Sequence, residues 1–145
     1  MSPESEKRRA RAGADLALAF FLADRDPLWA VVALFYGVHH LLIALSLERL
    51  GEARVPRDYE EADGLFKRAG LPRSLRKAYK RLLRLSWRAR YEPLSREEGW
   101  ELWREALKAY TALREALGGA GRVSILILSC LSSHPLKGLA CVVLP

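Results

Sequence analysis

WAVVALFYGVHHLLIAL, residues 29–45, is apolar on every face of a helix except at two adjacent histidines, His39 and His40. No charged side chain lies between Asp26 and Glu48. A helix that is hydrophobic all round is either the buried centre of a bundle or a membrane span. The run is long enough to cross a bilayer, but its polar residues would be costly at mid-membrane. We therefore expect a core helix and no membrane partner.

Helical patterns on both sides of this run predict the fold class. Asp26 can cap the central helix, and Gly51 can end it in the left-handed conformation. Ser95 and Glu98 have the spacing of a capping box before the last helix. The polar residues 52–63 are predicted to form a loop. Helices are predicted at residues 6–23, 27–50, 65–70, 72–92 and 96–117. The expected fold is all-α, a four- to five-helix up-and-down bundle.

The chain is predicted to divide into a helical bundle domain, residues 1–117, and a C-terminal tail, residues 118–145. No acidic residue follows Glu115, and both cysteines fall in the tail. VSILILSCL, residues 123–131, is strand-like in composition. We expect an irregular apolar extension that is either disordered or docked on the bundle. A body without cysteine fits a reducing cytoplasm, and the N-terminal residues show no export signal.

The composition limits the classes of partner. The 145 residues carry a net charge of +7, which indicates an acidic partner such as RNA, DNA or an anionic surface. The absence of asparagine and glutamine fits a thermophile, although a GC-rich genome would also favour such a composition. Cys130, His134 and Cys141 lack a fourth ligand at a zinc-like spacing, and no glycine-rich phosphate loop occurs. We expect neither a metal nor a cofactor.

The strongest electrostatic signal is the predicted helix that begins at Pro72. Up to Tyr91 it carries eight basic residues and no acid, with tyrosine and tryptophan interleaved. Basic groups beside aromatic rings are typical of nucleic-acid binding. The candidate contacts are Arg76, Lys80, Arg84, Arg88 and Tyr91. The alternative is a solvated face whose bases pair with acids of the last helix, namely Glu97, Glu98, Glu101 and Glu105.

The two central histidines point about 100° apart on a helix, so one can be buried while the other lines a cleft. The simpler interpretation is a core histidine satisfied by a hydrogen bond. The alternative is a catalytic site with His40 as general base and Arg88 or Arg90 stabilising a phosphate.

Three segments together resemble HEPN-type proteins, and in particular a group of small uncharacterised prokaryotic HEPN-like proteins. Residues 29–44 resemble the F-Y-x-x-x-H-x-x-x-A segment of a central HEPN helix. YKRLLRLSWRARYEP, residues 79–93, resembles the L-x-x-x-R-x-x-A-R-Y helix end of the group. VPRDYEE, residues 55–61, is similar to its H-P-R-S-H-E-E loop. The resemblance covers roughly residues 14–117.

The HEPN resemblance implies a four- or five-helix bundle, usually a homodimer, in toxin–antitoxin, defence or RNA-processing systems. Its expected partners are RNA and a nucleotidyltransferase-type or antitoxin protein. Catalytic members cut RNA without a metal through an Arg-x(4–6)-His motif, which this chain lacks. His40 matches the central-helix histidine, and Tyr59 stands where a loop histidine is frequent. The expected function is therefore non-catalytic binding of RNA or a protein. The alternatives are a ribonuclease with a degenerate site and a purely structural dimerisation module.

Overall fold

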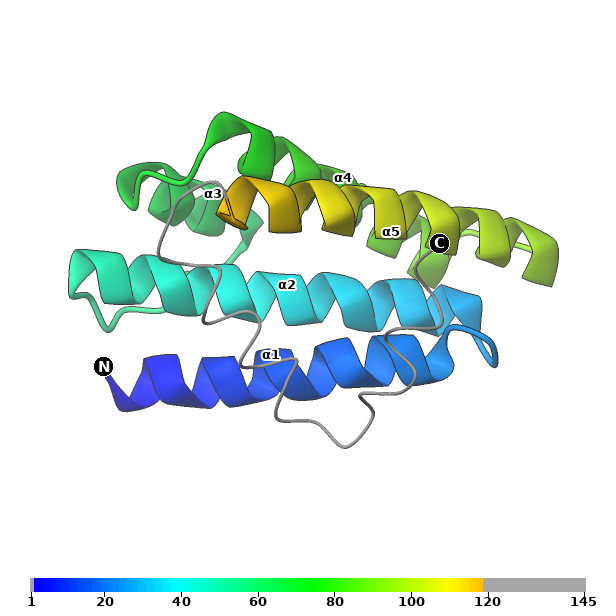
Figure 1. Cartoon of the computed structure of the whole chain (residues 1–145), viewed down its shortest axis with the longest axis horizontal. Helices are drawn as coiled ribbons and strands as arrows, with labels where there is room; N and C mark the ends of the chain where they lie inside the picture. Colours follow the sequence, from blue (N-terminus) through cyan, green and yellow to red (C-terminus); the bar gives the residue numbers. More distant parts are fainter. Residues whose placement is uncertain (1, 119–145) are drawn as a thin grey trace.

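The computed structural model describes residues 2–118, which form five α-helices and no strand (Figure 1). The helices are α1 (Pro3–Leu22), α2 (Pro27–Leu50), α3 (Tyr59–Arg68), α4 (Arg73–Tyr91) and α5 (Arg96–Gly118). The predicted all-α fold class is confirmed. Apart from Gly118, which ends α5, the predicted tail lies outside the described residues.

The central element is α2, which packs against each of the other four helices. On one side of it, α1 lies alongside in the opposite direction, and the antiparallel pair α4 and α5 covers another side (Figure 1). The short helix α3 lies at the end of α2 where that helix finishes. This arrangement is an up-and-down bundle with one short additional helix.

The predicted caps set the ends of two helices. The Asp26 carboxylate accepts a hydrogen bond of 3.2 Å from the Trp29 N–H at the start of α2. Gly51 ends α2 with φ of 64°, a left-handed conformation that favours glycine. Before α5, the Ser95 Oγ accepts from the Glu98 N–H at 3.2 Å, and the Ser95 N–H donates to Glu98 at 2.6 Å. The capping box is therefore confirmed.

The predicted loop at residues 52–63 is wrong in its second half, because α3 already begins at Tyr59. The Asp58 carboxylate caps it by accepting from the Glu61 N–H at 2.8 Å. Acidic residues in the first turn suit the positive end of the helix dipole. The sequence did not predict the start of this helix because its first residues are mostly polar. The buried residues of the helix are Ala62, Leu65 and Phe66. The first helix also starts earlier than predicted, at Pro3.

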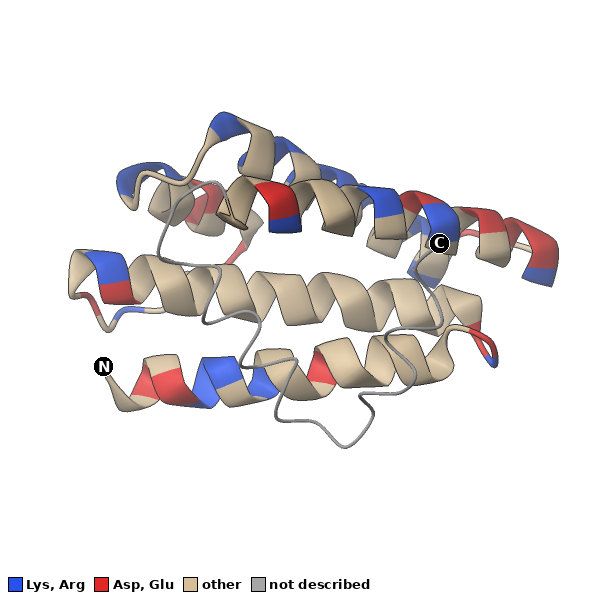
Figure 2. Ribbon diagram, viewed as in Figure 1, with Lys and Arg blue, Asp and Glu red and all other residues tan. Residues whose placement is uncertain are grey.

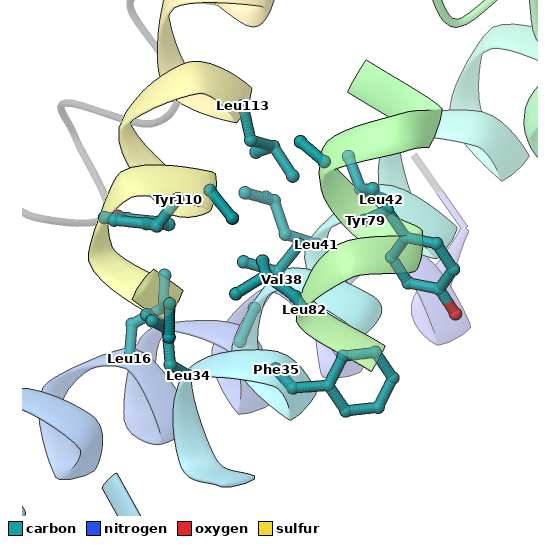
Figure 3. Packing of buried hydrophobic residues seen from close by; sticks show 14 of the residues in the cluster. Leu16, Leu34, Phe35, Val38, Leu41, Leu42, Tyr79, Leu82, Tyr110 and Leu113 are labelled. Atoms are coloured by element: carbon teal, nitrogen blue, oxygen red, sulfur yellow. The ribbon is translucent and has the colours of Figure 1, made fainter. Parts of the chain in front are cut away.

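The apolar run forms the core of the bundle. Val38 and Leu41 of α2 lie close to Leu82 of α4 and to Tyr110 and Leu113 of α5 (Figure 3). Among residues 2–118, α2 alone is long and apolar enough to cross a membrane, and 83% of its most apolar 18-residue window is buried in the fold. Each fully buried leucine or phenylalanine contributes roughly 1.5–3 kcal/mol. The run therefore packs as the predicted core helix.

Gly37 lets α1 approach α2 closely. A Cβ atom at this position would lie 2.7 Å from Leu16 Cγ and 3.0 Å from the Leu16 backbone nitrogen. Any side chain here would push the two helices apart. The close contact places two charged residues of α1, Arg8 and Asp15, beside His40 of α2.

Candidate nucleic-acid interface

Helix α4 separates an apolar face from a basic one. Leu75, Tyr79, Leu82 and Ser86, which recur at helical spacing, are all buried. The basic residues fall mainly on the opposite side, and they form repeated bands along α4 (Figure 2), whereas α2 is almost free of charge. The helix therefore presents cations to the surface because its sequence is strongly amphipathic.

A groove of about 970 Å³ follows the basic side of α4 and is lined by residues from α3, α4 and α5. Basic side chains outnumber acidic ones in its lining. The basic ones are Lys77, Lys80, Arg81, Arg84 and Lys108, and the acidic ones are Glu60 and Asp63. A concave surface with an excess of positive charge attracts a polyanion.

Two of the predicted contacts are partly neutralised by Asp63 of α3. The Asp63 carboxylate lies 3.7 Å from Arg76 Nη1 and 3.4 Å from Lys80 Nζ, and Lys67 is 3.1 Å away. Burial raises the pKa of Asp63, but hydrogen bonds from Lys67 and Lys80 outweigh it and bring the pKa below its ordinary value. This carboxylate is therefore charged at neutral pH and competes with any external anion for these cations.

The acids of α5 neutralise little of the basic face. In the part of the chain that the structure describes, one ion pair joins α4 to α5, between Arg81 and Glu105 at 3.6 Å. The predicted contact Arg88 instead pairs within its own helix end, with Glu92 at 3.0 Å. Glu98 is used in the capping box. The alternative of a broadly ion-paired face is therefore wrong for most of the four acids.

Three exposed cations of the groove remain without an acidic partner among residues 2–118: Lys77, Arg84 and Lys108. Arg84 was predicted as a contact. Lys77 belongs to the same basic run and was not singled out, and Lys108 was missed because it comes from α5. No sequence spacing connects Lys108 to α4, so only the packing of the two helices reveals it.

The C-terminal end of α4 carries exposed aromatic rings. Trp87 is 51% exposed and the predicted contact Tyr91 is 68% exposed. Their ring centroids are 5.5 Å apart in an edge-to-face arrangement. The Arg90 guanidinium lies 5.8 Å and 5.2 Å from the two ring centroids. Cations and aromatic rings thus share one helix, as the sequence predicts.

Two of the three catalytic candidates, Arg90 and His40, belong to a second polar cluster around Tyr36. Arg90 Nη1 donates a hydrogen bond of 3.2 Å to the Tyr36 hydroxyl, and the Tyr36 ring stacks on His40 with centroids 6.4 Å apart. Arg90 and His40 are therefore brought together around Tyr36, whereas Arg88 is directed to Glu92. Tyr36 is not among the residues predicted for the site, although its position four residues before His40 places both on one helical face.

His40 lines a second groove of about 490 Å³ between α1 and α2. Arg8 Nη1 lies 2.9 Å from His40 Nδ1, and since arginine can only donate, this nitrogen accepts. His40 Nε2 lies 3.9 Å from Asp15. Burial and the nearby Arg8 lower the pKa of His40, partly opposed by Asp15. His40 is therefore a neutral imidazole whose basic nitrogen is already occupied.

His39 takes the more buried of the two positions. Its Nδ1 lies 2.9 Å from the hydroxyl of Tyr79 in α4, and its ring stacks on the same tyrosine. Burial, with smaller contributions from His40 and Arg8, lowers the pKa of His39 to about 4. His39 thus matches the simpler interpretation, a core histidine satisfied by a hydrogen bond.

Among the described residues, no group of three or more histidine, cysteine, aspartate or glutamate side chains is arranged to hold a metal ion. The candidate ligands Cys130, His134 and Cys141 lie outside the described residues. Comparison of the chain with models of protein families, with curated proteins and with solved structures finds no significant match.

Proposed function

We propose that this chain is a non-catalytic, HEPN-like helical module that binds RNA in the groove along α4. The observation that carries the proposal is the set of exposed groove cations without an acidic partner in the described chain: Lys77, Arg84 and Lys108. Cations without an acidic partner can bind phosphates and displace their counterions. This release of counterions supplies much of the affinity for nucleic acid. Lys80 would contribute a further contact once an incoming phosphate competes with Asp63.

The geometry of His40 favours binding over cleavage. A general base needs a free lone pair, and the accepting nitrogen of His40 is occupied by Arg8 at 2.9 Å. The chain also lacks the Arg-x(4–6)-His motif. The HEPN resemblance extends the proposal to a cytoplasmic homodimer in a toxin–antitoxin or defence system, with a nucleotidyltransferase-type or antitoxin protein as a second partner.

The experiment that tests RNA binding is fluorescence anisotropy of a labelled RNA at several salt concentrations. The variant Lys77→Glu/Arg84→Glu is compared with Lys7→Glu/Arg25→Glu, which makes the same change of net charge on α1 and in the following turn. Each phosphate contact adds roughly 0.7–0.9 to the log–log salt slope. We expect the groove variant to lower the slope by about 2 and the affinity by on the order of 100-fold.

The control variant distinguishes an effect of the groove from an effect of the overall charge, because both double variants change the net charge equally. Equal losses in the two variants would contradict a specific site on α4. If the parent protein does not bind RNA even at low salt, the proposal fails and the basic face serves a protein partner. Size-exclusion chromatography with light scattering would then show whether the chain acts as a dimerisation module.

A specific observation favours ribonuclease activity as the second candidate. Arg90 and His40 both contact Tyr36, so a phosphate beside the Tyr36 hydroxyl would have an arginine and a neutral histidine within reach. Moving Arg8 away from His40 Nδ1 would free a base. Incubation of RNA with the protein in EDTA tests this candidate. Cleavage that is lost in both His40→Ala and Arg90→Ala would support it, and absence of cleavage by the parent would remove it.

A further inference from the structure

The outward face of α4 changes character along its length. Lys77 and Arg84 line the groove, whereas Trp87 and Tyr91 follow at the C-terminal end of the helix. At 100° per residue, Lys77, Arg84 and Tyr91 fall within about 40° of one another around the helix axis. At 1.5 Å per residue they extend over about 21 Å. By the same count Trp87 lies about 60° from Arg84, so the cations and both aromatic rings lie on one side of the helix.

Trp87 and Tyr91, here called the aromatic end, are held in place yet remain accessible. Their edge-to-face contact, with ring planes at 63°, does not cover either ring completely. Arg90 packs beside both rings and is itself fixed by its hydrogen bonds to Tyr36 and to the Ser86 carbonyl. Two large rings that contact each other and Arg90 while more than half exposed are placed to stack on a flat ligand.

We infer that the aromatic end stacks on bases of an unpaired strand, so that the polynucleotide bound along α4 is single-stranded. This inference rests on the proposed RNA binding. Bases within a duplex are covered on both faces by their neighbours, and only an unpaired base can offer a face to a side chain. Stacking on aromatic rings beside a basic groove is how proteins bind single strands without sequence preference.

A duplex would use this surface poorly. The major groove of A-form RNA is deep and narrow and does not admit protein side chains, so duplex RNA could engage only the cations through its phosphates. The rings of Trp87 and Tyr91 would then remain in water at one end of the contact. A single strand places phosphates on Lys77 and Arg84 and bases on the two rings at once.

The test compares an unstructured oligouridylate with a blunt-ended RNA duplex of equal phosphate count. Anisotropy titrations use the parent, Trp87→Ala/Tyr91→Ala, and the matched control Phe21→Ala. Phe21 is also an exposed aromatic residue with an arginine over its ring, but it lies on α1. Circular dichroism shows that each variant is folded.

We expect the parent to prefer the single strand, and the aromatic variant to bind it at least about fivefold more weakly, the smallest loss expected for one stacked base, with little change for the duplex. The control variant should bind as the parent does. Equal affinity of the parent for both RNAs, or unchanged single-strand affinity in the aromatic variant, would overturn the inference while the charge-reversal result still supports RNA binding. Failure of the parent to bind either RNA would overturn both proposals.

Discussion

The charged half of α1 and the outward face of α4 are both rich in arginine, but they differ in how that charge is balanced. Each arginine of α1 meets an acid: Arg8 meets Glu4, Arg9 meets Glu48, and Arg11 meets Asp15. On α4, Lys77 and Arg84 have no such partner within residues 2–118. Basic side chains are free to bind an external anion only where the fold does not already pair them with acids.

The difference begins in the sequence. In α1 two acids stand four residues from bases, in the pairs Glu4–Arg8 and Arg11–Asp15, so the helix neutralises these two arginines itself. Helix α4 contains no acid and must obtain its counterions from other elements. Asp63 and Glu105 provide them for Arg76, Lys80 and Arg81. Lys77 and Arg84, which have no acidic partner within residues 2–118, are available to an external anion.

The largest effect is expected when acid protonates His39, which packs against Tyr79 of α4. The pKa of His39 falls from 6.5 to about 4 on folding, so below pH 6.5 the unfolded chain binds more protons. Stability is complete above that pH and is lost as the pH falls toward 4, by up to about 3 kcal/mol. Urea unfolding at about pH 7 and about pH 5 should differ by about 2 kcal/mol from this group.

The variant His39→Phe isolates this contribution, because it removes the titrating group and keeps a ring at the position. The loss of stability between the two pH values should become smaller in the variant than in the parent. Identical losses would show that His39 is not held neutral by its burial against Tyr79.

The next effect concerns the ion pair between α1 and α2. Glu48 accepts hydrogen bonds from Arg9 Nε at 2.7 Å, from a second nitrogen of Arg9, and from Ser5 Oγ at 2.6 Å. Glu48→Gln removes the carboxylate that Arg9 and Ser5 share in this partly buried contact and should cost about 2 kcal/mol in chemical denaturation. Glu101→Gln, at an exposed acid of α5, is the control and should cost almost nothing. A neutral result for Glu48→Gln would mean that the pair is as weak as a surface one.

Asp63→Asn makes the opposite change, because it removes an acid that neutralises cations of α4. The change removes the acid that Arg76, Lys80 and Lys67 share, so the groove gains positive charge. We expect RNA affinity to rise on the order of tenfold, about one phosphate contact, with a steeper salt slope in anisotropy titrations. Glu4→Gln, which removes an acid from α1, serves as the control. An unchanged or weaker affinity would place the RNA away from this end of the groove.

The smallest effect is expected on the stability of the fold when Lys77 and Arg84 lose their charges. Lys77→Gln/Arg84→Gln removes two exposed charges without an acidic partner in the described chain, and stability should change by less than about 0.5 kcal/mol. Thermal unfolding measures it, and RNA affinity should fall in the same sample. A larger loss of stability would show that these residues hold the fold together and are not reserved for a ligand.

Much of the architecture could be predicted because its signals are local. The caps at Asp26 and Ser95 and the left-handed Gly51 depend on residues within one turn, and all three are found. The error at α3 has the opposite cause. The helix has too few core residues for a clear apolar periodicity, and in sequence the capping residue Asp58 cannot be told from an acid in a loop.

The candidate site could be predicted only in part. The basic face of α4 and the exposed Tyr91 follow from the sequence of one helix. The contact of Arg90 with Tyr36 joins residues 54 positions apart, and no pattern in either helix connects them. Lys108 enters the groove for the same reason, because α5 packs against α4.

Composition and periodicity along single segments are enough to predict that the chain is helical, that residues 29–45 form its core and that α4 presents its bases outward. Which cations are neutralised, which histidine is buried and which ring lies beside Arg90 depend on contacts between helices. A helix that is apolar all round carries no signal for its orientation. The orientation of α2 is fixed instead by the close packing of α1 at Gly37 and by the contact of α4 with His39.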